Sequence, residues 1–333
     1  MERSIRKRKN RFLDFLMPHR SKRSRANKPR PAGDRPDFTA GLPRKLLDPA
    51  LQAQNLGMNS GRPRVRKVSV GIVTYNQTDL EIQQVVATAK QALASQFCCK
   101  ESRILILDNG RTTAHATVSG DSVTHLRSRG NIGFGAGQNV LMAEAFKSHS
   151  DLYIAANPDG RFHPDAIEEL IRMLSAHGDR ALIEAIQFPD EHPKEFNPET
   201  FETPWVSGAC LAVPRTVYDS IGGFDEAFFM YCEDVDFSWR ARAAGFGTKI
   251  CPRSLFSHAV MNRPYDRARH QQFLNSGLLL AKKWRNPPFE NMILRELKAA
   301  SFKIPECTIP QIPEDWTRVS DFAHRFSFAV TRW

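Results

Sequence analysis

Residues 67–93, KVSVGIVTYNQTDLEIQQVVATAKQAL, decide the fold class of this chain. The part from Lys67 to Asn76 is rich in β-branched residues and ends in polar ones, which predicts a buried strand. Apolar residues then recur at helical spacing between Leu80 and Leu93, which predicts a helix. A strand followed directly by a helix is the unit from which parallel sheets are built, so this stretch indicates an α/β fold.

The same alternation continues downstream. Three further segments have the composition of buried strands: 103–110, 122–128 and 151–157. Two have the apolar spacing of helices: 134–147 and 163–178, with Pro164 in the first turn of the latter. The alternation predicts a mostly parallel central sheet that helices cover on both faces. After about residue 180 the segments become shorter, which predicts a mixed second half that completes the same sheet.

Charge is distributed unevenly along the chain. The formal net charge is +11, but 19 of the 47 Lys and Arg, and only 5 of the 36 Asp and Glu, lie in residues 1–67. Residues 1–66 are also rich in Pro and lack periodicity, so we expect a disordered leader. A basic leader raises the alternative of a nucleic-acid-binding protein. The leader has few aromatic residues for stacking, and the rest of the chain shows no basic face, so we expect no nucleic-acid partner.

The sequence contains no stretch of the roughly 18 uninterrupted apolar residues that span a bilayer, and residues 11–17 are too short and charged for a signal-peptide core. We therefore expect a cytoplasmic protein. Each Lys or Arg near an anionic leaflet contributes about 1 kcal/mol, so the leader could hold the protein peripherally at the cytoplasmic face of the inner membrane, or serve solubility alone. Six cysteines without a CxxC pair suggest reduced, mostly buried thiols.

Polar residues and glycines follow the predicted strands: Thr74 with Asn76, Asp108 with Asn109, Asn131 with Gly133, and Asn157 with Asp159. Because the carboxyl ends of parallel strands meet at one edge of a sheet, we expect a ligand site there. The glycines of residues 131–139, NIGFGAGQN, do not have the G-x-G-x-x-G spacing of a dinucleotide fold. A nicotinamide site is therefore not favoured.

Residues 155–162, AANPDGRF, place Asn157 and Asp159 on a turn after an apolar strand. Their hard oxygen atoms suit Mg²⁺ or Mn²⁺ bound together with phosphate, although Asn-Pro-Asp-Gly is also an ordinary turn sequence. His258 closes a later strand, and a lone histidine is more often structural than a ligand. The context of these residues has to decide between the two interpretations.

Residues 228–240, FFMYCEDVDFSWR, set three carboxylates directly after an apolar run. Val235, Trp239 and Ala243 recur every four residues, which predicts a helix that begins near Glu233 and keeps this stripe in the core. The acidic residues would then lie in the first turn, where they complement the helix dipole.

The charged residues of this helix are interpreted differently from one another. Asp236 and Arg240 are one turn apart, so we expect a surface ion pair. Glu233 and Asp234 follow the apolar run directly, and a carboxylate partly withdrawn from water has a raised pKa and is a better base. The sequence therefore marks these two as candidates for acid–base chemistry.

Seven motifs in order resemble the family 2 glycosyltransferases, especially the rhamnosyltransferase-like branch: VSVGIVTYNQ, ILILDNG, GNIGFGAGQN, AANPDGRF, WVSGACLAVPR, IGGFDEAFFMYCEDVDFSWRARAAG and SHA. The resemblance covers residues 67–285 and implies a GT-A fold, with a nucleotide-binding half in 67–178 and an acceptor-binding half in 179–285. Residues 286–333 would then be a C-terminal helical extension.

The resemblance also implies roles for single residues. Those implied to bind the nucleotide sugar are Thr74, Tyr75, Asn76, Asp108, Asn131, Gly133, Asn139 and Asn157, with Asp108 meeting the pyrimidine. Asp159 matches the second position of the metal-binding D-x-D motif, which has Asn157 in its first position here. His258 matches a histidine that completes the metal shell in some members, so Mg²⁺ or Mn²⁺ is the expected cofactor. Trp205 and Gly208 are candidates for the sugar and acceptor cleft, with a buried Trp in a core strand as the alternative.

Glu233 and Asp234 match the ED motif of the family, whose Asp typically serves as the base; Glu233 would orient it or bind the acceptor. The implied activity is inverting transfer of a sugar, with rhamnose from dTDP-rhamnose as the best guess, to a hydroxyl of a glycan or lipid-linked acceptor in cell-surface polysaccharide biosynthesis. A nucleotidyltransferase is the alternative enzyme class, but the TYNQTD segment lacks the glycine-rich basic phosphate loop of that class.

Overall fold

A computed structural model describes residues 66–94, 99–110, 118, 120–190, 194–260, 264–306 and 308–322. All of the predicted leader except Arg66 lies outside the described residues, as do Cys98, Cys307 and residues 323–333. Within the described ranges, no helix has both the length and the apolar character that crossing a membrane requires. Three of the cysteines, Cys210, Cys232 and Cys251, are free thiols and buried, which confirms the prediction for these three.

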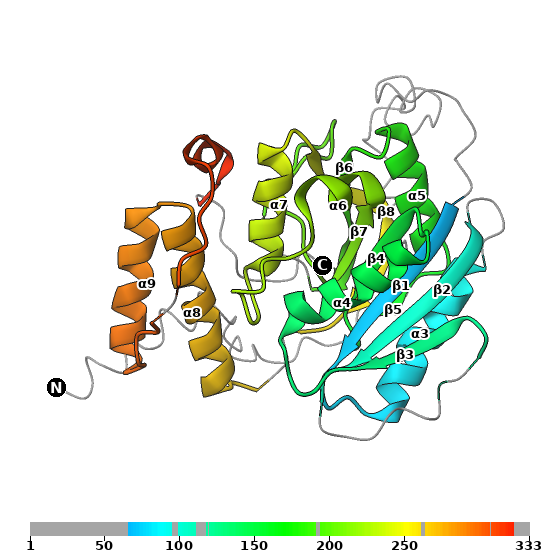
Figure 1. The fold of residues 1–333 in the computed structure, drawn as a ribbon, viewed down its shortest axis with the longest axis horizontal. Helices are drawn as coiled ribbons and strands as arrows, with labels where there is room; N and C mark the ends of the chain where they lie inside the picture. The colour runs from blue at the N-terminus through cyan, green and yellow to red at the C-terminus, as the bar shows by residue number, and fades with distance from the viewer. Residues whose placement is uncertain are drawn as a thin grey trace, which may run out of the picture. The chain divides into compact units, whose positions relative to one another are not determined.

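The first half of the chain forms the predicted parallel sheet. Strands β1 (Arg66–Thr74), β2 (Cys99–Asp108), β3 (Val123–Arg127) and β4 (Leu152–Ala156) lie in the order β3-β2-β1-β4, and each neighbouring pair is parallel. Their carboxyl ends therefore meet at one edge, where Thr74, the last residue of β1, pairs in register with Asp108, the last residue of β2. The parallel half of the fold prediction is confirmed (Figure 1).

The second half extends the same sheet with mixed strand directions. The added strands are β7 (Cys210–Pro214), β6 (Ala181–Pro189), β8 (Gly247–His258) and the short β5 (Arg161–Phe162). Strand β7 is antiparallel to both β4 and β6, β6 is parallel to β8, and β5 is antiparallel to β8. The eight described strands thus form one mixed sheet, as the loosened pattern after residue 180 predicted.

Helices cover both faces of the sheet because alternate strand residues point to opposite sides. One core contains Ile104 and Ile106 of β2 with residues of α3 (Asp79–Leu93) and α5 (Ala166–Ala176). The other contains Leu105 and Leu107 with residues of α4 (Phe134–Lys147), α6 (Arg215–Ile221) and α7 (Glu233–Ala243). Helix α3 begins at a capping box between Thr78 and Glu81, which supplies the start signal that the apolar spacing alone does not.

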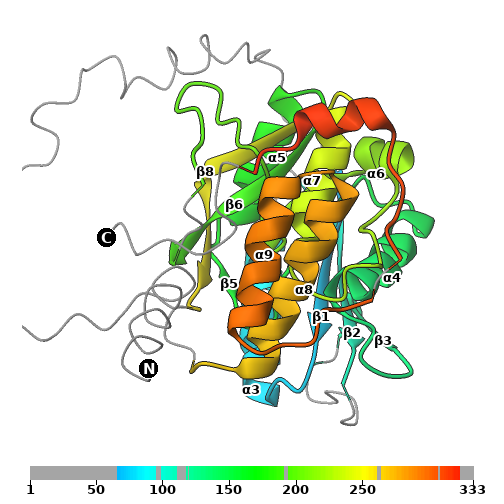
Figure 2. The same cartoon turned by 90° about the vertical axis from the view of Figure 1, so that its left-hand side faces the viewer.

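A third core joins the C-terminal part of the chain to α7. Helices α8 (Arg267–Lys283) and α9 (Pro287–Ala299) contact each other along their length, and the 3-10 turn η2 (Glu314–Val319) contacts α7 (Figure 2). Trp239 of α7 meets Trp284 edge to face at 5.2 Å between ring centroids and Phe322 at 4.9 Å. Within the predicted extension 286–333, η2 and Phe322 therefore pack against the helix that carries the candidate base, whereas α9 packs against α8.

Two details of the predicted helices are wrong. Pro164 precedes α5 instead of lying in its first turn, because Asp165 is the residue that flanks the helix start at Ala166. Ala243 ends α7 and is only half-buried, whereas Val235 and Trp239 are buried as predicted. Three residues at a spacing of four drift around a helix with 3.6 residues per turn, so the last member of such a stripe leaves the buried face.

Candidate functional site

The three residues predicted to bind the nucleotide at the end of β1 differ in exposure. Thr74 is buried, and its hydroxyl donates to the Leu107 carbonyl at 3.3 Å. Tyr75 is 49% exposed, and Asn76 is exposed with φ 59°, a left-handed conformation that asparagine tolerates. Tyr75 and Asn76 can therefore meet a ligand with their side chains, whereas Thr74 supports the end of the strand.

Asp108 has a buried carboxylate with an unused acceptor. Its Oδ1 accepts from the Gly110 amide at 2.9 Å, and its Oδ2 is buried without a hydrogen-bond partner in the described part of the chain. Such an atom costs free energy unless a ligand donor satisfies it. The N–H of a nucleotide base has the chemistry that this oxygen lacks.

Asn109 organises the loop between β3 and α4 and was not among the predicted binding residues. Its Nδ2 donates to Asn131 Oδ1 at 3.0 Å and to the Gly133 carbonyl at 3.1 Å, while its Oδ1 accepts from the Ser128 hydroxyl at 2.9 Å and the Ile132 amide at 3.0 Å. One buried amide therefore ties the ends of β2 and β3 together. Its position directly after Asp108 at a strand end was the available signal.

Gly133 is required where α4 begins. It has φ 89°, and a Cβ there would lie 2.2 Å from the Phe229 carbonyl oxygen. The Phe134 amide donates to that same carbonyl at 2.9 Å. The loop after β3 is thereby fastened to the segment that leads into α7.

Asn139 uses its amide inside the protein. Its Nδ2 donates to the Phe224 carbonyl and to Glu226 Oε1, both at 2.9 Å, and its Oδ1 accepts from the Phe224 amide at 2.8 Å. These bonds hold the 224–226 segment against α4. Its predicted place in the nucleotide pocket stays a prediction, and these hydrogen bonds give Asn139 a supporting role.

The two predicted metal ligands, Asp159 and His258, lie together with Asn157 at the ends of β4 and β8. His258 Nε2 is 3.2 Å from Asn157 Nδ2 and 3.4 Å from Asp159 Oδ1. On the other side of the ring, His258 Nδ1 lies 2.9 Å from Gln187 Oε1. This contact holds the ring so that Nε2 faces Asn157 and Asp159.

This set fits a hard divalent cation that keeps part of its shell for other ligands. Asp159 offers a carboxylate and His258 an imidazole nitrogen, while Asn157 can turn its amide oxygen inward. No group of three or more His, Cys, Asp and Glu residues suited to a metal ion exists among the described residues. Mg²⁺ and Mn²⁺ commonly complete such a shell with phosphate oxygens and water.

Asp234 is held in place by two backbone amides. The Gly208 amide donates to its Oδ2 at 3.0 Å, and the Val235 amide donates to its Oδ1 at 2.9 Å. Burial raises the pKa of Asp234, even though both amides and Lys194 lower it. The predicted withdrawal of this carboxylate from water is therefore present in the structure, and its role as the base stays a prediction.

Glu233 is more deeply buried than its neighbour. Its side chain is 5% exposed, and Oε2 has no hydrogen-bond partner among the residues described. Burial, reinforced by the charge of Asp234, raises the pKa of Glu233 well above its ordinary range. The protonated form of Glu233 is thereby favoured, and a protonated carboxyl group can donate a hydrogen bond to a ligand or to Asp234.

The candidate base and the candidate metal site meet on one short segment. The Gly208 amide binds Asp234, and the carbonyl of the next residue, Ala209, accepts from the Asn157 amide at 2.9 Å. Consecutive residues lie about 3.8 Å apart along the backbone, so the two groups are attached at neighbouring positions. A Cβ at Gly208 would lie 3.0 Å from the Phe134 ring, so a larger residue here would push against that ring.

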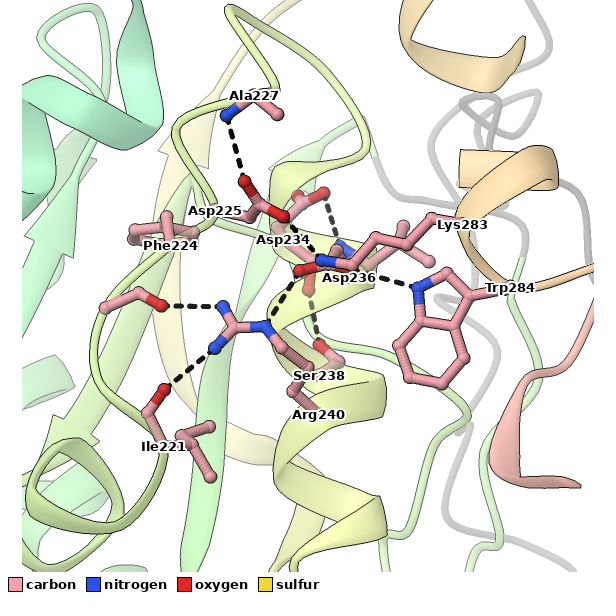
Figure 3. Close-up of polar contacts among 12 residues, drawn as sticks. Ile221, Phe224, Asp225, Ala227, Asp234, Asp236, Ser238, Arg240, Lys283 and Trp284 are labelled. Carbon is pink, nitrogen blue, oxygen red and sulfur yellow. Dashed lines mark hydrogen bonds and ion pairs between the residues drawn. The ribbon is translucent and has the colours of Figure 1, made fainter. Parts of the chain in front are cut away.

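The ion pair predicted between Asp236 and Arg240 of α7 exists, but the prediction that it lies on the surface is wrong. Arg240 Nε does bind Asp236 Oδ2 at 2.8 Å, but the Asp236 side chain is 0% exposed. Asp236 also receives Lys283 Nζ at 2.6 Å and the Trp284 indole at 2.9 Å (Figure 3). A spacing of four along a helix does not show that a distant helix covers the pair.

Trp205 was predicted either to line the sugar and acceptor cleft or to be a buried residue of a core strand, and the structure agrees in part with the second interpretation. Its side chain is 1% exposed and belongs to the third core, so it does not line an open cleft, and it precedes β7 instead of lying in a strand. Lys194 Nζ lies 3.9 Å from the centroid of its ring. Lys194 and its partner Glu184 were not predicted, because neither forms a motif in the sequence.

Comparisons with known proteins agree with this geometry. No family model matches the chain. It is 28% identical to the N-acetylglucosaminyl-diphospho-decaprenol L-rhamnosyltransferase of Mycobacterium tuberculosis over 214 residues, which covers 50% of this chain and 70% of that protein. It is 24% identical to the low-salt glycan biosynthesis hexosyltransferase Agl10 of Haloferax volcanii over 195 residues, which covers 51% of this chain and 62% of that protein.

Two solved structures share the fold. GalNAc-T7 with UDP, GalNAc and Mn²⁺ superposes with a TM-score of 0.56 at 12% identity, over 73% of this chain and 52% of that one. The mannosyltransferase PcManGT of Pyrobaculum calidifontis with GDP-Man and Mn²⁺ superposes with a TM-score of 0.54 at 16% identity, over 77% of this chain and 80% of that one. The fold is therefore the GT-A fold, as predicted.

Proposed function

We propose that this family 2 glycosyltransferase of glycan biosynthesis moves a sugar from a nucleotide-diphosphate donor to a hydroxyl group of a lipid-linked or glycan acceptor. The transfer inverts the configuration at the anomeric carbon. Rhamnose from dTDP-rhamnose is the first candidate, because the mycobacterial relative is named for L-rhamnosyl transfer to a diphospho-decaprenol-linked sugar. The observation that carries the proposal is the attachment of Asp234 and Asn157 to the adjacent residues Gly208 and Ala209.

Asp234 takes the proton of the acceptor hydroxyl as that oxygen attacks the anomeric carbon opposite the leaving diphosphate. The Gly208 and Val235 amides hold one oxygen each, which fixes the carboxylate plane and leaves lone pairs for the hydroxyl. Its raised pKa makes it a stronger base than an exposed aspartate. Glu233 orients Asp234 or binds the acceptor through its unpartnered oxygen.

The nucleotide lies over the ends of β1, β2 and β3 in this proposal. Asp108 Oδ2 accepts from the base, and the exposed ring of Tyr75 offers a stacking surface next to Asn76. Asn131 and Gly133 shape the loop that closes this side. Residues 67–178 act as the nucleotide half and 179–285 as the acceptor half, with α9 and η2 supporting the latter.

Asp159 and His258 would hold a divalent cation, with Asn157 beside them. When bound, Mg²⁺ or Mn²⁺ supplies positive charge that stabilises the departing diphosphate. Both solved neighbours were crystallised with Mn²⁺. Gln187 supports the site by holding the His258 ring through Nδ1.

The cellular setting is also part of the proposal. A lipid-linked acceptor would bring the enzyme to a membrane, and the basic leader provides charge that an anionic leaflet attracts. We propose a cytoplasmic enzyme that contacts the cytoplasmic face of the inner membrane peripherally, and we propose no nucleic-acid partner.

The reaction class is tested by incubating the full chain with Mn²⁺ and a panel of nucleotide sugars. We expect donor-dependent release of a nucleoside diphosphate, fastest with dTDP-rhamnose. Release of pyrophosphate from a nucleoside triphosphate and a sugar phosphate would indicate a nucleotidyltransferase instead. Diphosphate release that is equal for all donors would leave the class standing and overturn rhamnose as the preferred sugar.

Asp159→Ala is expected to weaken metal-dependent binding of the nucleotide sugar about 10-fold or more, because outer-shell and ligand losses at metal sites have effects of this size. Calorimetric donor titrations with Mn²⁺ and with EDTA measure the effect. Asp165→Ala is the matched control, since Asp165 is exposed and makes no capping bond at α5. An Mn²⁺ titration that is the same for both variants would place the metal elsewhere.

A further inference from the structure

A buried pair of opposite charges lies beside Asp234 and has no assigned role. Lys194 Nζ is 2.6 Å from Glu184 Oε2, and the two side chains are 1% and 6% exposed. Glu184 comes from β6, and Lys194 from the segment that follows this strand. Withdrawing two charges from water costs free energy that their attraction often fails to recover, so stability alone is a weak reason for such a pair.

Adjacent backbone amides connect this pair to the candidate base. The Ser207 amide donates to Glu184 Oε2, and the next amide, of Gly208, donates to Asp234 Oδ2 at 3.0 Å. The two carboxylates are therefore held at neighbouring positions of one segment, and the Lys194 ammonium is shared electrostatically between them. Ser207 also anchors this segment, because its hydroxyl accepts from the Ala209 amide at 3.3 Å.

The charges act in opposite directions on Asp234. Burial raises the pKa of Asp234, and Lys194 lowers it. Burial likewise raises the pKa of Glu184, where Lys194 lowers it and Asp234 raises it. Because electrostatic coupling is mutual, an ionised Glu184 raises the pKa of Asp234 in turn.

The other titratable groups near Asp234 do not replace Lys194. Cys232, which precedes α7, and Glu233, its first residue, come directly before Asp234, and the charge of Asp234 raises the pKa of both. On the side of α8, Lys283 is bound to Asp225 and Asp236 at 2.6 Å each. Segment 205–209, which carries Gly208, contains no charged residue.

We propose that Lys194 and Glu184 are positioning residues that set the ionisation of Asp234. Lys194 keeps the carboxylate charged and ready to accept a proton, and Glu184 moderates that effect while it holds Lys194 and the Ser207 amide in place. The proposal deepens the proposed function and rests on it, because it requires Asp234 to act as the base.

The test is the pH dependence of kcat/KM for sugar transfer by the full chain with Mn²⁺ and its preferred donor. Lys194→Met removes the positive charge, so the acidic limb should move up by about one pH unit. Glu184→Gln removes the negative charge but keeps an oxygen for Lys194 and Ser207, so the limb should move down by a similar amount. The double variant should lie near the wild type.

Variants of the same two positions provide the controls. Lys194→Arg keeps the charge and should keep the wild-type limb. Thermal unfolding and donor titration verify that each variant folds and binds. If Lys194→Met does not fold, Glu184→Gln and the double variant still decide the question. Only electrostatic tuning predicts that the acidic limb moves down in Glu184→Gln and returns toward the wild-type position in the double variant.

Two outcomes would overturn the inference: an acidic limb that is unchanged in Glu184→Gln, or single variants that both shift it in the same direction. Failure of the proposed function looks different. In that case Asp234→Asn would retain sugar transfer. If Asp234→Asn is inactive but the acidic limb stays in place in the Lys194 and Glu184 variants, only the role of Lys194 and Glu184 is overturned.

Discussion

Asp234→Asn is expected to reduce sugar transfer about 10²-fold or more, because general-base catalysis contributes at least this much and asparagine cannot accept the proton. Donor binding should be nearly unchanged, since the residues proposed to bind the nucleotide lie at the ends of β1, β2 and β3. Transfer is measured with acceptor at saturation, and donor affinity by calorimetry. The reduction should appear in kcat, since the substrate still binds.

The same substitution should leave the fold intact. Asparagine keeps one carbonyl oxygen for either the Gly208 or the Val235 amide and loses the other bond, while it removes a charge that burial disfavours. The folded pKa of Asp234 is raised above its unfolded value, so ionisation weakens the wild type as the pH rises between the two. The stability of the variant relative to wild type should therefore increase from about pH 4 upwards, as unfolding temperatures at several pH values would show.

Glu233→Gln and Asp219→Asn provide the comparison for this prediction. Asp219 is exposed on α6, so its variant should transfer sugar like the wild type. Glu233→Gln should retain more activity than Asp234→Asn, because glutamine can still donate a hydrogen bond in place of the neutral acid. The reverse order would assign the base to Glu233, and loss of donor binding in Asp234→Asn would show that its carboxylate serves the donor.

Local sequence patterns predict much of the scaffold because local physics forms it. The alternation of apolar residues in β1 and β2 sorts them onto two faces, and the helix predicted at 134–147 has the observed bounds of α4. The polar strand ends also predict where the site lies, since parallel strands bring Asn76 and Asp108 to one edge. The contact between His258 and Asp159 follows from the family motifs more than from spacing.

Features that depend on contacts between distant segments could not be predicted. Asp236 and Arg240 have the spacing of a surface ion pair. The pair is buried because Lys283, the last residue of α8, and Trp284, which follows it, contact Asp236. Lys194 has no motif, and its burial depends on how segment 205–209 folds over it. Charges buried in pairs look like surface charges until both partners are placed.

Lys283→Met is expected to lower the free energy of unfolding by about 3–5 kcal/mol, because breaking a buried ion pair has a cost of this size. Asp225 would lose its lysine partner, and the buried Asp236 would keep only Arg240 as a cation. Lys283 Nζ lies 2.6 Å from both Asp225 Oδ2 and Asp236 Oδ1, in the group of residues drawn in Figure 3. Burial by itself would raise the pKa of Asp225, but the hydrogen bond from Lys283 and its other contacts outweigh this and lower it. The mutation should therefore raise the pKa of Asp225 again.

Chemical denaturation measures the free energy of unfolding of Lys283→Met and of Lys282→Met. Both variants replace a lysine of α8 with methionine, so the difference between them reports on the buried ion pairs. Lys282 is the neighbouring residue of α8 and is only half-buried, so its variant should lie within about 1 kcal/mol of the wild type. Adding Asp236→Asn to Lys283→Met should restore part of the loss, because it removes one of the charges left behind. Equal stabilities for the two lysine variants would contradict the network. The position of α7, and with it Asp234, would then depend on the apolar contacts of Trp239 and not on this group of charges.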